Sequence, residues 1–184
     1  NNLLVATAGN DTLKGSTRGL RSDLNQADYS AGTTPLTVNL GVSDSLGTVT
    51  GAAFGTDTLQ NIDKVFGGSG ADSFTVGTLH VANFGDIAEI EGLAGNDSIV
   101  GNGFTRLAYT RSTAGVSVNL AAGTALDGLG GNDTFSGVNK VLGSAFADTF
   151  AGSTGFNIFE GGAGGDVING GSAANRAIYV SSPT

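Results

Sequence analysis

The sequence predicts an all-β fold built as a parallel β-solenoid, because short apolar strands alternate with glycine-rich turns at a fixed period. Residues 143–178 read as four consecutive units of nine residues. Each unit opens with Gly and carries Asp or Asn at its sixth place. Glycine allows the positive φ angles of tight turns, and the x-apolar-x triplet after the Asp or Asn has the pattern of a very short strand whose middle side chain points inward.

One unit cannot bury its single apolar side chain alone, so the units are expected to stack. Stacking would join the apolar residues Phe150, Phe159, Ile168 and Ile178 into continuous columns. The alternative is a flexible Gly/Ser linker, which 32 glycines in 184 residues would also suggest. A linker needs no apolar residue at a fixed place, so the periodicity favours the solenoid.

Two of the nine-residue units match the pattern Gly-Gly-x-Gly-x-Asp-x-apolar-x at every place. They are residues 67–75 and 161–169. The pattern resembles the RTX (hemolysin-type calcium-binding) nonapeptide repeat. The resemblance implies a parallel β-roll with Gly-rich calcium-binding turns, two units per turn of 18 residues, and several bound Ca²⁺ ions.

The resemblance makes the turn aspartates the candidate metal ligands, because Asp supplies hard oxygen atoms and turn carbonyls supply others. The candidates are Asp72, Asp97, Asp133, Asp148, Asp166, Asp57 and Asp11. Asp148 and Asp166 are 18 residues apart and should stack in neighbouring turns, as should Asn157 and Asn175 on the opposite side. The asparagines are neutral and should bind calcium weakly. The pairs Asp57/Asp72 and Asp133/Asp148 are 15 apart, which leaves open whether either pair shares an ion.

A longer repeat contains the nonapeptides. Residues 29–40 align with residues 109–120, and similar matches follow along both segments. The chain is therefore expected to form one solenoid over residues 1–184, with long repeats at about 29–108 and 109–178 and partial copies at 1–28 and 179–184. We expect Tyr29 to share its surroundings with Tyr109, and Lys64 with Lys140. The first copy carries an insertion at residues 78–88, which contains His80 and should form a loop.

Composition excludes several classes of function. The net charge of −8 argues against nucleic-acid binding and suits cations as partners. The chain has no Cys, so a disulfide framework and a thiolate metal site are impossible. No apolar run approaches the roughly 20 residues that a membrane-spanning helix needs.

These observations favour a structural, calcium-binding segment of a larger secreted or cell-surface protein, and not an enzyme. Its role would be that of a spacer, an adhesin segment or a surface-layer segment, with flanking domains, calcium-induced folding outside the cell, and export by type I secretion as the resemblance implies. One alternative is a face that binds ice or surface glycans, formed by the hydroxyl residues that follow the turn aspartates: Thr12, Thr58, Ser73, Ser98, Thr134 and Thr149. The other is a polysaccharide-modifying enzyme, with candidate residues His80, Asp86, Glu89 and Glu91.

Overall fold

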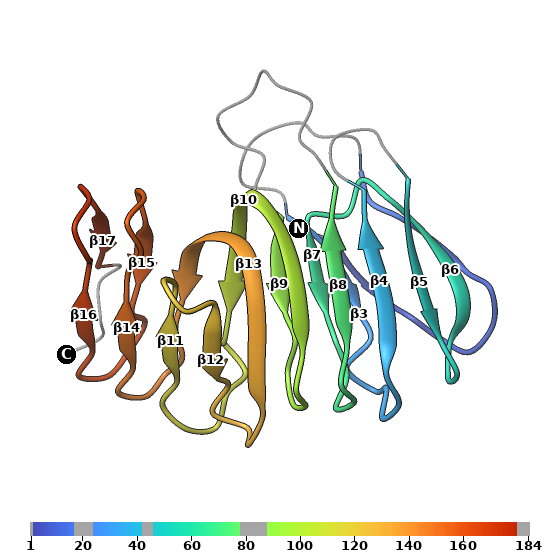
Figure 1. The fold of residues 1–184 in the computed structure, drawn as a ribbon. Helices are drawn as coiled ribbons and strands as arrows, with labels where there is room; N and C mark the ends of the chain where they lie inside the picture. Colours follow the sequence, from blue (N-terminus) through green and yellow to red (C-terminus); the bar gives the residue numbers. More distant parts are fainter. Residues whose placement is uncertain (1, 17–23, 42–45, 78–87, 180–184) are drawn as a thin grey trace.

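The computed structural model describes residues 2–16, 24–41, 46–77 and 88–179. Within these residues every regular element is a strand, and the strands belong to one sheet that is mostly parallel (Figure 1). The strands are β1 (Asn2–Val5), β2 (Thr12–Lys14), β3 (Asn25–Asp28), β4 (Leu36–Leu40), β5 (Gly47–Gly51), β6 (Gly55–Gln60), β7 (Lys64–Phe66), β8 (Ser73–Val76), β9 (Glu89–Glu91), β10 (Ser98–Ala108), β11 (Ser117–Asn119), β12 (Thr124–Leu126), β13 (Asn132–Leu142), β14 (Thr149–Ala151), β15 (Ile158–Glu160), β16 (Val167–Asn169) and β17 (Arg176–Ile178). The expectation of an all-β chain is confirmed over the described residues.

The strand pairings form two rows that share the long strands β10 and β13. The first row runs β2, β6, β5, β4, β8, β10, β13, β12, β11, β14, β16. The second runs β1, β3, β7, β9, β10, β13, β15, β17. The N-terminal parts of β10 and β13 pair within the first row, and their C-terminal parts pair within the second. The register between the two strands shifts at Thr105.

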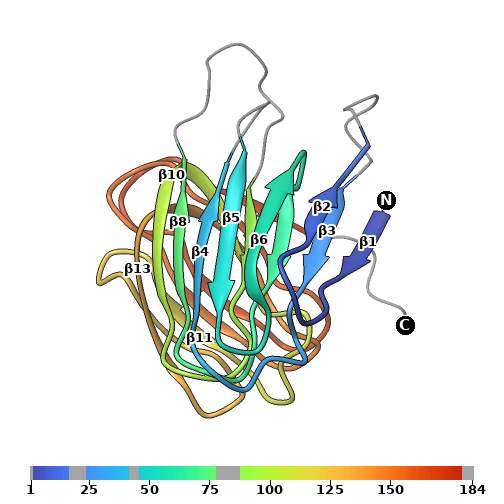
Figure 2. The ribbon, with the colours of Figure 1, turned by 90° about the vertical axis from the view of Figure 1, so that its right-hand side faces the viewer.

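Antiparallel hairpins are inserted into the first row at two places. β4 and β5 pair antiparallel, as do β5 and β6, and Figure 2 shows these strands side by side with β8. The segment β11 to β13 repeats the arrangement with two antiparallel pairings. The alternation of Leu36, Val38 and Leu40 with Thr37 and Asn39 places the apolar side chains in the core and the polar ones outside.

An apolar column runs along the inner side of the second row. Ala27, Val65, Ile90, Leu107, Val141, Phe159 and Ala177 follow one another in register on neighbouring strands. All but the last are buried. The first row packs against this column from the other side of the core. The ring of Phe150 on β14 of the first row stacks on the ring of Phe159 on β15 of the second row, with centroids 5.8 Å apart.

The expected place of Ile178 in this column is wrong. Ala177 pairs with Phe159, while Ile178 pairs with Glu160. Side chains alternate between the two faces of a strand, and the inward residue is the second after the turn Asn or Asp. After Asn175 that residue is Ala177. The prediction that Phe150, Phe159 and Ile168 point into the core is confirmed, although Ile168 is only half-buried.

The two repeat copies match at their tyrosines but not at their lysines. Tyr29 and Tyr109 are both buried, and each hydroxyl donates a hydrogen bond to an Asp carboxylate. Lys64 is buried and forms ion pairs with two glutamates. Lys140 is half-buried, and its partners on the two neighbouring strands are Arg106 and Ile158. Burial and, second, the Arg106 charge lower the pKa of Lys140. The expected match for the lysines is therefore wrong, because Ile158 occupies the place that Glu89 takes beside Lys64.

Candidate calcium-binding turns and the buried ion network

The carboxylate of a turn aspartate ties its own turn together. Asp72 Oδ2 accepts a hydrogen bond from the backbone N–H of Gly68 at 2.8 Å, and Asp148 Oδ2 accepts one from Ser144 at 2.7 Å. Asn157 does the same with its Oδ1 and the N–H of Ser153, at 2.9 Å. The sixth residue of the unit therefore closes the turn whether or not it carries a charge.

The first glycine of each unit makes room for this carboxylate. A Cβ on Gly92 would lie 2.0 Å from Asp97 Oδ2, and one on Gly161 would lie 2.0 Å from Asp166 Oδ2. A Cβ on Gly143 would meet both Asp148 Oδ2, at 2.2 Å, and the carbonyl oxygen of Gly161 in the next turn, at 2.3 Å. Glycine is required at these places by close approach.

The second carboxylate oxygen links one turn to the next. The backbone N–H of Asp72 donates to Asp97 Oδ1 at 2.8 Å, and that of Asp97 donates to Asp133 Oδ1 at 3.1 Å. Asp148 donates to Asp166 Oδ1 at 3.0 Å. These contacts place carboxylates on neighbouring strands in two ladders, one of Asp72, Asp97 and Asp133 and one of Asp148 and Asp166.

The hairpins lie between the ladders. The N–H of Leu36 at the start of β4 donates to Asp72 Oδ1, and that of Val116, just before β11, donates to Asp148 Oδ1, each at 2.8 Å. The pairs separated by 15 residues are therefore not neighbours: β5 and β4 separate Asp57 on β6 from β8, and β12 and β11 separate Asp133 on β13 from β14.

The stacking expected from the 18-residue spacing is confirmed. Asp148 directly precedes β14 and Asp166 directly precedes β16. The two strands pair in parallel with Thr149 opposite Val167, so the two aspartates lie in neighbouring turns. The Asn pair stacks in the same way before β15 and β17, and the N–H of Asn157 donates to Asn175 Oδ1 at 2.9 Å. Because β14 and β16 belong to the first row and β15 and β17 to the second, the aspartates and asparagines lie on opposite sides, as expected.

The remaining candidates, Asp11 and Asp57, form a separate pair. The N–H of Asp11 donates to Asp57 Oδ1 at 2.8 Å, and the hydroxyl of Tyr29 donates to Asp57 Oδ2 at 2.9 Å. Asp133 has the corresponding contact with Tyr109, at 3.4 Å. The sequence aligned the two tyrosines but gave no sign of their aspartate partners, which are 28 and 24 residues away.

Burial places the ladder carboxylates in an unfavourable environment for negative charge. Asp72, Asp97 and Asp133 are each no more than 3% exposed. Burial raises the pKa of Asp72. Burial first, and then the charges of Asp133, Asp72 and Asp127, raise the pKa of Asp97 to about 8. Burial and the charge of Asp127 raise the pKa of Asp133 to about 7.

Calcium fits this donor set. The turns offer carboxylate and carbonyl oxygens, which calcium prefers, and the buried Oδ2 of Asp97 has no hydrogen-bond partner. Within the described residues, no three Asp, Glu or His side chains converge closely enough to hold a metal by themselves. Any ion in the turns would therefore need backbone carbonyls as well as carboxylates.

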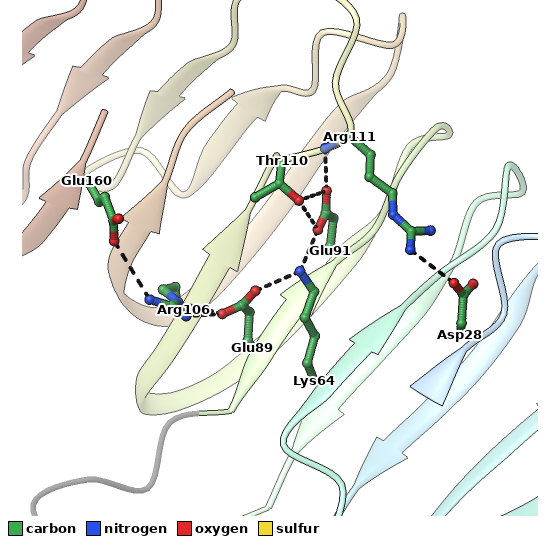
Figure 3. A network of polar contacts seen from close by, with 8 residues as sticks. All are labelled: Asp28, Lys64, Glu89, Glu91, Arg106, Thr110, Arg111 and Glu160. Carbon is green, nitrogen blue, oxygen red and sulfur yellow. Dashed lines mark hydrogen bonds and ion pairs between the residues drawn. The ribbon is translucent and has the colours of Figure 1, made fainter. Parts of the chain in front are cut away.

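The candidate catalytic glutamates belong to a buried ion network on the second row (Figure 3). Lys64 Nζ lies 2.8 Å from Glu89 Oε1 and 2.7 Å from Glu91 Oε2, and Arg106 also pairs with Glu89. Glu91 further accepts hydrogen bonds from the hydroxyl of Thr110 and the backbone N–H of Arg111. Carboxylates held in this way have a structural role. The other two candidates, His80 and Asp86, lie outside the described residues.

The comparison with known protein families matches the turns. Residues 1–17, 88–103 and 142–176 match the RTX calcium-binding nonapeptide repeat in four copies. Asp11, Asp97, Asp148 and Asp166 lie in these segments, and Asp57, Asp72 and Asp133 lie outside them. No curated protein matches the chain. None of the described segments forms a helix long and apolar enough to span a membrane. The chain therefore carries RTX calcium-binding nonapeptide repeats, a family of repeats that binds several calcium ions per array.

Proposed function

We propose that this chain is a calcium-binding structural segment of a secreted or cell-surface protein, wound as a parallel β-roll that becomes ordered when calcium binds. The observation that carries the proposal is the ladder of the buried aspartates Asp72, Asp97 and Asp133 on neighbouring strands. Calcium is scarce in the cytosol and millimolar outside the cell, so the segment would pass through a type I secretion system unfolded and fold outside. There it would act as a spacer, an adhesin segment or part of a surface layer.

The electrostatics of the ladder give calcium its role. Neighbouring strands are about 4.8 Å apart, and two carboxylates at that distance repel by about 3 kcal/mol at an effective dielectric constant of 20. A divalent cation between them reverses the sign of this energy. A carboxylate has about four acceptor positions, so an Asp that accepts one or two hydrogen bonds keeps the capacity to bind an ion.

The proposed ligands are the seven turn aspartates together with turn carbonyls. They are Asp11, Asp57, Asp72, Asp97, Asp133, Asp148 and Asp166. Asp57 and Asp133 share their carboxylates with tyrosine hydroxyls, so their contribution to calcium affinity should be smaller than that of Asp97 or Asp166.

The test compares two substitutions at equivalent places. Asp166→Ala removes a charged ligand stacked on Asp148, while Asn157→Ala removes a neutral side chain that closes a similar turn. The number of bound Ca²⁺ ions, counted by native mass spectrometry, should fall for Asp166→Ala and stay the same for Asn157→Ala. Equal counts in the two variants would contradict the assignment of the aspartate side.

A second candidate function, a face that binds ice or glycans, is favoured by a row of exposed hydroxyl residues. Thr56, Thr50, Thr37, Ser73, Ser98, Thr134 and Thr124 follow one another in register across seven neighbouring strands. All are exposed. The row contains three of the six residues expected from the sequence. The hairpins supply Thr50, Thr37 and Thr124, and Thr56 lies on β6.

The row has the properties of a surface for a neutral, periodic partner. Its members carry no charge, their spacing is that of the strands, and threonine side chains are stiff at χ1, so they lose little entropy on binding. Ser98→Arg would place a long charged side chain in the middle of the row. Thermal hysteresis or glycan-array binding that Ser98→Arg abolishes, and that Thr154→Arg in an exposed turn leaves intact, would support this function. Wild-type protein without either activity would rule it out.

A further inference from the structure

Two buried carboxylate oxygens in neighbouring turns have no hydrogen-bond partner. They are Oδ2 of Asp97 and Oδ2 of Asp127, and each residue is 1% exposed. An ionised carboxylate oxygen withdrawn from water and left unpaired costs several kcal/mol. None of the ion pairs within the described residues involves either aspartate. A bound cation would give both oxygens the partner that the described residues do not provide.

Asp127 is fixed inside its turn by its other oxygen. Oδ1 accepts hydrogen bonds from the backbone N–H groups of Leu129, at 2.7 Å, and Gly131, at 2.8 Å. Oδ2 is thereby held toward Gly131, where an added Cβ would lie 2.5 Å from it. Asp127 precedes its glycines, unlike the repeat aspartates, and it lies outside the segments that match the nonapeptide repeat.

The turn that contains Asp127 stacks on the turn that contains Asp97. The N–H of Asn132 donates to Asn96 Oδ1 at 2.8 Å, and the N–H of Asp97 donates to Asp133 Oδ1. The same added Cβ on Gly131 would lie 1.8 Å from the carbonyl oxygen of Gly95. The Gly95 carbonyl and Asp127 Oδ2 thus lie against the same glycine.

Charge interactions connect the two carboxylates. The negative charge of Asp127 contributes to the raised pKa of Asp97, after burial and the charges of Asp133 and Asp72. Burial raises the pKa of Tyr109, and the negative charges of Asp133, Asp127 and Asp97 raise it further. The region around Tyr109 is therefore a concentration of buried negative charge.

We propose that Asp97 and Asp127 bind a Ca²⁺ ion with their Oδ2 atoms, with the carbonyl oxygen of Gly95 as a third ligand. All the donors are hard oxygens, two of them charged, and calcium accepts such sets in flexible geometry with water completing the shell. This site uses a carboxylate that the repeat pattern does not include. It shares Asp97 with the repeat turns and rests on the proposed calcium-binding function to that extent.

The direct test is Asp127→Asn, which keeps the Oδ1 acceptor and replaces the unpaired oxygen by an amide nitrogen. The count of bound Ca²⁺ ions in native mass spectrometry should fall by one relative to the wild type. Asp28→Asn is the matched control, because Asp28 is also buried but pairs with Arg111 on the second row. Its count should equal that of the wild type.

A second measurement does not depend on the folding of Asp127→Asn. Terbium replaces calcium, and its luminescence is excited through tyrosine, since the chain has three Tyr and no Trp. Tyr109→Phe should reduce the sensitised emission while leaving the number of bound ions unchanged, because Tyr109 would be the tyrosine beside the ion. Emission that Tyr109→Phe leaves unchanged would place no ion there.

The outcomes separate the two proposals. Wild-type protein that binds no calcium contradicts both the proposed function and this site. Wild-type protein that binds several ions, with the same count in Asp127→Asn, contradicts this site alone. Loss of one ion in Asp127→Asn but not in Asp28→Asn supports it.

Discussion

At the scale of single residues, similar sequence positions have different energetic roles according to their neighbours. Lys64 is 5% exposed and pairs with Glu89 and Glu91, which are also buried. It also lies 4.1 Å above the ring of Phe66. Lys140 has the same place in the long repeat but lies between Arg106 and Ile158 in register. The first lysine neutralises buried acids, and the second does not.

The different surroundings of the two lysines predict different effects on stability when each is replaced by Met. Lys64→Met should lower the free energy of unfolding by roughly 3 to 5 kcal/mol, because it leaves buried carboxylates without their cation. Lys140→Met should change it by less than about 1 kcal/mol or increase it, because burial already disfavours that charge. Urea denaturation in saturating calcium measures both, and equal losses would contradict the roles assigned to the two lysines.

The glycines of one turn provide a second residue-scale prediction. Gly161→Ala would place a Cβ 2.0 Å from Asp166 Oδ2, while Gly165→Ala would meet no atom within 4 Å. The first should displace the carboxylate, lower stability by about 1 to 3 kcal/mol and weaken calcium binding. The second should be neutral or stabilising by up to about 1 kcal/mol. Calcium titrations of both variants, followed by thermal melting, test this, and identical behaviour would show that the carboxylate does not need the space.

The turn aspartates are predictable from the sequence because the nonapeptide fixes their place. Asp127 is not predictable in this way, since a carboxylate that precedes its glycines has no place in the repeat pattern. The aspartate partners of Tyr29 and Tyr109 were also missed, because each contact joins residues far apart in the chain. Only the recurrence of both motifs at similar separations could have suggested the pairs.

At the scale of strands and turns, the stability of the array depends on one inward side chain per strand. Phe159 is 1% exposed and stacks on Phe150 across the core, whereas Phe156 in the preceding turn is 53% exposed. Each strand contributes little apolar area, so a single column residue carries a large share of the packing.

The two phenylalanines therefore form a matched pair for mutation. Phe159→Ala should cost about 3 to 5 kcal/mol, as expected for an aromatic side chain removed from a packed core. Phe156→Ala should cost less than about 1 kcal/mol. Chemical denaturation in calcium measures the two losses, and a large loss for Phe156→Ala would contradict the assignment of the inward face.

The aspartate ladder predicts a pH dependence without calcium. The pKa values of Asp97 and Asp133 in the folded chain are about 8 and about 7, above the usual aspartate value of 3.8. The folded state thus binds more protons than the unfolded state between about pH 4 and pH 8, so stability falls as pH rises through that range. The melting temperature in chelator should decrease from pH 5 to pH 9, and saturating calcium should remove most of that decrease. A melting temperature in chelator that rises with pH would show that these acids are not buried as described.

At this scale the sequence predicted the existence of the strands better than their partners. The alternation at residues 36–40 and 116–120 indicated half-buried strands, which the structure confirms. Their antiparallel pairing with β5 and β12 was not predicted, because a period of nine residues carries no information on a hairpin inserted into a parallel row. The register at Ala177 could have been read from the sequence by counting two residues from Asn175.

At the scale of the whole molecule, the described chain combines modest apolar burial with a concentration of buried acids. The net charge is −8, and the 32 glycines lose much backbone entropy when the turns become ordered. The buried ion network around Lys64 supplies positive charge on the second row, while the ladder of Asp72, Asp97 and Asp133 lies on the first. The free energy of ordering without a metal is therefore expected to be small or unfavourable.

The central claim is that calcium is a condition for this fold, and thermal melting followed by far-ultraviolet circular dichroism tests it most directly. An ion that binds only the folded state adds about 2.7 kcal/mol per site at a hundredfold excess over its dissociation constant. Several sites should therefore raise the melting temperature steeply with calcium concentration, and chelator should lower it or abolish the β-sheet signal. Magnesium at the same concentration is the control for ionic strength and should have a much smaller effect. An identical melting temperature in calcium and in chelator would contradict the account.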